Sequence, residues 1–248
     1  MSTDALRRLT ATEFTLFLRD KIGPIFGVFF PIALLSIFGS LDFFTDPANG
    51  IDGVPLLHTY VPILVGFVIA MLALNTLPPT LAGYREQGVL RRLRTTPIGP
   101  TRVLGAQLAI CFAAAAVSVL LLLAVARLAF DVPLPRNPLA FALATVLASL
   151  ALIGIAVLIA AVTPTGKAAN AVGSVLFYAL MFFGGLYVPI EAMPTALRQV
   201  SEATPVGAAV QALTAATEGH WPAAWQLPLL AGYALVTALL GVRLFRWE

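Results

Sequence analysis

The sequence predicts an all-α membrane protein with six transmembrane helices, and three observations support that class. Hydrophobic residues make up 59% of the 248 residues, whereas charged residues make up only 11%. Soluble domains carry about 25% charged residues, so a chain with a mean hydropathy of +0.92 and so few charges cannot cover a globule with polar groups. Six stretches also lack Asp, Glu, Lys and Arg over the length of about 20 residues that a membrane-spanning helix needs.

The predicted spans are the apolar parts of these six stretches. After polar and turn residues are trimmed from their ends, they cover 22–41, 60–81, 103–126, 138–162, 168–188 and 226–243. The runs are continuous and rich in Leu and Ala, which favours helices, because a helix satisfies every backbone polar group within its own segment. The first run is too long for a secretory signal, so residues 1–248 are expected to form a single transmembrane domain.

Basic residues predict the orientation of the spans, because cytoplasmic segments carry an excess of Lys and Arg. With the N-terminus inside, the cytoplasmic segments hold 12 basic residues, and the outside segments hold 3, namely Arg127, Arg136 and Arg198. Both termini of this multi-pass chain are therefore expected in the cytoplasm, with the spans in the cell (plasma) membrane. The small net charge of +3 argues against a nucleic-acid partner.

Residues 4–20 precede the first span and have an amphipathic pattern. On a helical wheel, one arc holds the apolar residues Leu6, Leu9, Phe14, Leu16, Phe17 and Leu18. This pattern is typical of a helix that lies in the plane of the membrane interface, where it could act as an anchor or take part in gating. Glu13 and Asp20 fall inside the apolar arc, so each is either misplaced by the wheel or paired with a cation on a neighbouring helix.

A basic segment connects spans two and three. Val89, Leu90 and Leu93 are interleaved with three arginines, and Pro97 ends the pattern. We expect a short cytoplasmic helix over residues 84–97.

The segment between spans five and six, residues 189–225, contains four helix-breaking prolines. From Pro205 to Glu218 the pattern is helical but too short to cross the membrane. We expect short extracellular re-entrant helices here.

Three motifs follow one another along the chain. The first is Phe17-Leu18-Arg19-Asp20 ahead of a span with Pro24 and Pro31, and the second is Arg85-Glu86-x-Gly88-x-Leu90-x-x-Leu93-x-x-Thr96-Pro97 followed by Gly105. The third is Gly184-Gly185 followed by Pro189, Met193-Pro194, Leu197 and Thr204-Pro205. Together they resemble the permease subunits of ABC transporters in the type 2 exporter family, also called type V, over nearly the whole chain.

The resemblance implies that the second motif is a coupling helix that sits on a separate ATPase subunit. The residues it assigns to ATPase coupling are Arg85, Glu86, Gly88, Leu90, Arg91, Arg92, Leu93, Arg94, Thr96 and Pro97. The residues it assigns to the extracellular loop are Pro189, Glu191, Met193, Pro194 and Pro205. It further implies a pair of permeases, identical or related, with ATPase subunits that hold ATP and Mg. The chain has no large extracellular domain, which leaves small exporters of drugs, antibiotics, lipids or saccharide precursors, and so a link to multidrug or antibiotic resistance.

The chain has no phosphate-binding loop of the form Gly-x-x-x-x-Gly-Lys-[Ser/Thr]. The nearest stretch, Thr165-Gly166-Lys167-Ala168, lacks the first glycine and the hydroxyl. We therefore expect no ATP hydrolysis by this chain itself. Cys111 is the only cysteine, so a metal site of the Cys-cluster type is excluded.

Uncharged polar residues within the spans are candidates for the substrate path. They are Asn75, Thr76, Gln107, Thr145, Ser149, Asn170, Ser174 and Tyr178. Each could instead bond a neighbouring helix, with a contribution of about 0.6–2 kcal/mol. Asn75 and Thr76 lie deep in the second span and, with Ser174 and Tyr178, are the path residues we select.

Two other classes of membrane protein remain as alternatives. An ion-coupled secondary transporter or channel usually has ionisable groups within the membrane, and the predicted spans contain none at depth. A membrane-embedded enzyme needs a nucleophile with its base, paired carboxylates or clustered metal ligands, and His58, His220 and Cys111 form no such set in the sequence. A purely structural role also stays open.

Overall fold

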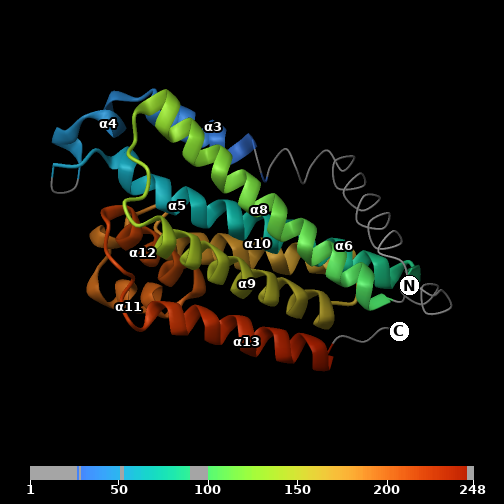
Figure 1. Ribbon diagram of the computed structural model, residues 1–248. Coiled ribbons are helices and arrows are strands. Elements are labelled where there is room, and N and C mark those ends of the chain that lie inside the picture. The colour runs from blue at the N-terminus through green and yellow to red at the C-terminus, as the bar shows by residue number, and fades with distance from the viewer. Residues whose placement is uncertain (1–26, 28, 51–52, 90–99, 245–248) are drawn as a thin grey trace.

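The computed structural model describes residues 27, 29–50, 53–89 and 100–244, and these form a bundle of helices that run alongside one another (Figure 1). The predicted interfacial helix at 4–20 and residues 90–97 of the predicted coupling helix lie outside this part. Within it, four helices are long and apolar enough to cross a membrane, and the helices Phe30–Gly39 and Gln226–Gly241 are apolar but shorter. The all-α membrane class is confirmed, and the count of six crossings stays a prediction.

The helices have the following bounds. They are α3 Phe30–Gly39, α4 Asp42–Thr45, η2 Pro47–Asn49, α5 Leu56–Met71, η3 Leu72–Thr76, α6 Leu77–Glu86, α8 Pro100–Phe130, α9 Pro138–Val162, α10 Gly166–Phe183, η4 Ile190–Ala192, α11 Thr195–Ala203, α12 Pro205–Glu218 and α13 Gln226–Leu244. The range of α9 equals the expected fourth span, and α8 extends beyond the expected third span at both ends.

The central helix of the bundle is formed by α5, η3 and α6 without interruption from Leu56 to Glu86. Pro78 and Pro79 have no N–H, so the carbonyls of Leu74 and Asn75 lose the donors that a regular helix would supply. The chain widens into the π-helical turn η3 at this point, which is a common response to a broken bonding pattern. In the most apolar 18-residue stretch of this central helix, 78% is buried within the protein.

Small residues let α9 and α13 pack closely along their lengths. A Cβ atom added at Gly154 of α9 would overlap Thr237 of α13, and one added at Gly241 of α13 would lie 3.1 Å from Val157. Small residues that permit this approach are typical of helix contacts in membranes, where dispersion replaces the hydrophobic effect as the main attraction.

The two ends of the bundle differ in construction. The hairpin end carries α4, α11 and α12, and Figure 1 shows α11 and α12 side by side with α4 apart from them at the same end of the bundle. The turn end is formed by the last turn of α6, Tyr84–Glu86, and by the connection between α9 and α10, Thr163–Thr165. Helix α13 runs from the hairpin end to the turn end (Figure 1).

Two differences from the expected boundaries affect the candidate site. Helix α10 ends at Phe183, not 188, because Gly184 and Gly185 stop it, and Gly185 has a left-handed φ of +88° that favours glycine. Residues 84–86, expected at the start of the coupling helix, belong to α6, and the chain leaves that helix at Gln87 and Gly88, where φ is +68°.

Candidate functional site

A polar contact joins η3 to the middle of α10. The Ser174 hydroxyl donates a hydrogen bond of 2.8 Å to Oδ1 of Asn75, and Nδ2 of Asn75 lies 3.5 Å from Sδ of Met71. The neighbouring Gly173 packs against the Leu74 carbonyl so closely that any Cβ there would overlap its oxygen. Two of the predicted path residues are thus brought together, and they bond to each other.

The other two predicted path residues have different surroundings. Thr76 is half-buried, and its carbonyl accepts a hydrogen bond of 2.8 Å from the Thr80 hydroxyl. Tyr178 is 61% exposed, and its ring contacts Phe177 edge to face with ring centres 5.3 Å apart. Tyr178 is therefore the one of the four selected path residues whose side chain is exposed on the protein surface.

One face of α10 is apolar and uncovered. Val172, Val175, Tyr178 and Phe182 are exposed, and their spacing of three and four residues places them on one stripe of the helix. Of the four long apolar helices in the described part, α10 has the lowest mean hydropathy, 1.3, and the smallest buried share of its apolar stretch, 28%. Lys167 and Asn170, near the start of α10, are also exposed, so the uncovered side of this helix is apolar only beyond Asn170.

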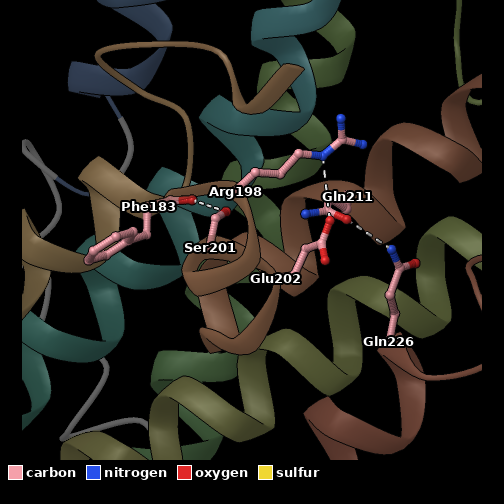
Figure 2. Close-up of polar contacts among 6 residues, drawn as sticks. All are labelled: Phe183, Arg198, Ser201, Glu202, Gln211 and Gln226. Carbon is pink, nitrogen blue, oxygen red and sulfur yellow. Dashed lines mark hydrogen bonds and ion pairs between the residues drawn. The ribbon is translucent and has the colours of Figure 1, made fainter. Parts of the chain in front are cut away.

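At the hairpin end, side-chain bonds fix the short helices to the long ones (Figure 2). The buried Ser201 hydroxyl of α11 donates to the Phe183 carbonyl at the end of α10, at 2.5 Å. Gln226 at the start of α13 donates to Oε1 of Gln211 on α12, at 3.4 Å. Within α11, Arg198 and Glu202 form an ion pair of 3.4 Å. The Ser201 bond therefore holds the end of α10 to α11, and the Gln226 bond holds the start of α13 to α12.

The predicted extracellular-loop residues begin and end short helices. Pro189 and Pro194 directly precede η4 and α11, and Pro205 is the first residue of α12. Proline fits these positions because its fixed φ suits a first helical turn. Met193 is buried, and the backbone of Glu191 lies in η4. Their role as loop elements in transport stays a prediction.

At the turn end, Arg85 and Glu86 are bonded within the chain. The Arg85 guanidinium donates to the carbonyl of Ala161 at 3.1 Å and to that of Thr163. The Glu86 carboxylate accepts from the backbone N–H of Gly166 at 2.9 Å. The remaining predicted coupling residues from Leu90 to Pro97 lie outside the described residues.

A cavity of about 490 Å³ opens at the hairpin end between α5, α12 and the α8–α9 connection. Its wall combines the apolar Val132 and Pro62 with the polar His58, Arg136 and Glu218. None of the predicted path residues lines it. Its wall is assembled from three separate segments of the chain, so no single sequence pattern indicates it. Among the described residues, no group of three or more His, Cys, Asp or Glu could hold a metal ion.

Comparison with known proteins gives one family. The profile described as ABC-2 type transporter matches residues 4–217, which is more than four fifths of the chain. No curated protein matches the sequence.

Proposed function

This chain belongs to the ABC-2 type transporter family, and on that premise we propose that it is the membrane-spanning half of an ATP-driven exporter. It is a multi-pass membrane permease, and ATP hydrolysis belongs to a partner nucleotide-binding subunit. We propose that ATP and Mg bind to that partner subunit. The predicted resemblance to ABC permeases is confirmed by the family match.

The proposed topology has six spans with both termini in the cytoplasm. The four long helices supply four crossings, the predicted span 22–41, of which α3 is part, supplies the first, and α13 supplies the last. Helix α13 has 19 residues, which at about 1.5 Å per residue nearly matches a hydrocarbon core of about 30 Å. The turn end is assigned to the cytoplasm because Arg85, Lys167 and Arg243 lie there, in agreement with the excess of 12 basic residues over 3.

The exposed face of α10 is the observation that carries the proposal. An exporter needs a path through the membrane, and a chain of 248 residues is too small to enclose one for a sizeable substrate. The stripe from Val172 to Phe182 is uncovered, and the polar Asn75–Ser174 contact lies on the same helix. We assign this face to a path shared with a second permease, identical or related.

The proposed substrate is a small amphipathic molecule, such as a drug, an antibiotic or a lipid-like compound. The exposed stripe combines the apolar Val175 and Phe182 with the hydroxyl of Tyr178, which suits a ligand with an apolar body and few polar groups. We propose that the segment 84–97 docks on the ATPase and transmits the motion driven by ATP hydrolysis to the spans.

Co-purification of the tagged chain in mild detergent tests the proposal. We expect a stoichiometric soluble ATPase to remain bound, and replacement of Leu90 and Leu93 by Asp to release it. A chain that purifies alone under several gentle conditions would contradict the proposal. Transport driven by an ion gradient without ATP would favour the ion-coupled secondary transporter.

A further inference from the structure

Three successive residues at the end of α6 bond to three different helices. The Tyr84 hydroxyl accepts a hydrogen bond of 3.2 Å from Nε2 of Gln107 on α8. Arg85 bonds to the end of α9, and Glu86 bonds to the start of α10. Successive side chains on a helix point about 100° apart, so one turn of α6 reaches neighbours on several sides.

The charges of Arg85 and Glu86 match the helix ends that they contact. The last carbonyls of a helix have no partners within it and carry a partial negative charge, which the Arg85 guanidinium satisfies at Ala161 and Thr163. The first N–H groups carry a partial positive charge, and the Glu86 carboxylate accepts from Gly166, the first residue of α10. Both charged groups therefore act on this chain's own helices.

The backbone contact at this point is close. A Cβ atom added at Gly166 would lie 3.1 Å from the Pro79 carbonyl oxygen and 3.6 Å from Cα of Gly83. The Thr165 hydroxyl caps α10 by accepting from Ala168 N–H at 3.2 Å. The start of α10 thus packs directly against the backbone of α6, and the hydrogen bond from Gly166 to Glu86 stabilises this contact.

We infer that Arg85 and Glu86 are positioning residues, which transmit movement of α6 to α9 and α10. The inference rests on the proposed function and deepens it. Gly88 is the point where the chain leaves the axis of α6. A push on the segment beyond it shifts the start of α10, while Ser201 holds the other end at Phe183. Helix α10 then tilts as a rigid body and moves the exposed face around Val175.

Substitutions at Glu86 separate this role from docking. Glu86→Gln keeps an oxygen that accepts the Gly166 N–H but removes the charge, whereas Glu86→Ala removes the acceptor. Gly166→Pro removes the same bond from the donor side, at a first helical position where proline is favoured, but it also adds a Cβ atom 3.1 Å from the Pro79 carbonyl oxygen. Gly166→Ala, which adds the Cβ atom and keeps the N–H, is therefore its matched control. Gln87→Ala is the matched control, because Gln87 is an exposed neighbour.

The measurement is hydrogen–deuterium exchange of the complete permease–ATPase complex in nanodiscs, with and without ATP. In the wild type, ATP is expected to change exchange across residues 166–176. Glu86→Gln and Gln87→Ala should behave like the wild type. Glu86→Ala and Gly166→Pro should retain the ATPase but lose the ATP-dependent change, and Glu86→Ala should speed basal exchange at the start of α10 by about fivefold, as loss of a helix cap does.

Two results overturn the inference while the proposed function stands. One is an unchanged ATP response at residues 166–176 in both bond-breaking variants. The other is loss of the ATPase from Glu86→Gln, which would show that the charge itself makes the docking contact. A wild-type chain that retains no ATPase would instead overturn the proposed function, before any variant is compared.

Discussion

Helices α8 and α10 leave similar shares of their surfaces uncovered but differ in composition. The buried share of the most apolar stretch is 33% in α8 and 28% in α10, whereas the mean hydropathy is 2.9 in α8 and 1.3 in α10. A helix that faces hydrocarbon is expected to be strongly apolar all along its exposed side. The lower hydropathy of α10 comes partly from the exposed Lys167 and Asn170, and we propose from this difference that α8 faces lipid and that α10 faces a path or a partner.

The largest expected difference between the two helices is in thiol reactivity. Leu120 of α8 and Val175 of α10 are similarly exposed, at 66% and 72%, and both lie near the middle of their helices. In a Cys111→Ala background, we expect Val175→Cys to react with a water-soluble thiol reagent at least about 50-fold faster than Leu120→Cys, because the thiolate does not form in hydrocarbon. Labelling in intact membranes measures the two rates.

The control for this comparison is labelling after denaturation, which should make the two cysteines equally reactive. Equal slow rates in native membranes would place both faces in lipid and remove the distinction between α8 and α10.

A smaller difference is expected from two glycines. A Cβ at Gly173 of α10 would overlap the Leu74 carbonyl, whereas a Cβ at Gly105 of α8 meets nothing within 4 Å. Gly173→Ala should lower the free energy of unfolding by about 1–3 kcal/mol through overpacking, and Gly105→Ala should leave it unchanged or raise it by up to about 1 kcal/mol. Unfolding in mixed detergent micelles provides both values.

The interpretation of α10 as a helix held against η3 would be wrong if Gly173→Ala were as well tolerated as Gly105→Ala.

The smallest expected difference concerns hydroxyl groups. Ser174 of α10 bonds to Asn75 on another helix, while Ser118 of α8 bonds to the Ala114 carbonyl of its own helix. A double-mutant cycle with alanine at positions 75 and 174 should give a coupling energy of about 0.6 kcal/mol. The same cycle between positions 75 and 118 should give none, and equal coupling in the two cycles would contradict the assignment.

Most of the helical fold could be predicted from the sequence because lipid imposes a simple constraint. The range 138–162 was predicted and found as α9, since Asn137-Pro138 marks its start and Thr163-Pro164 marks its end. The π-helical turn ahead of Pro78 and Pro79 was not predicted from the sequence. The end of α10 was set by Gly184 and Gly185, which apolar composition alone does not register as a boundary.

The site was less predictable because its bonds depend on three-dimensional proximity. Arg85 and Glu86 were predicted to contact an ATPase, yet their partners in the structure are backbone groups of Ala161, Thr163 and Gly166. Backbone partners cannot be recognised from the sequence, because every residue except proline carries the same N–H and carbonyl groups. Asn75 and Ser174 were both selected as path residues, but their mutual bond joins residues 99 positions apart.

The most direct test of the account is cysteine crosslinking in native membranes that contain the ATPase. Single-cysteine chains with Val175→Cys or Leu120→Cys, both with Cys111→Ala, are treated with a short bifunctional thiol reagent and resolved by size. We predict a covalent pair of permeases for Val175→Cys and monomers for Leu120→Cys. A pair formed through position 120 and not through position 175 would contradict the assignment of α10 to the shared path.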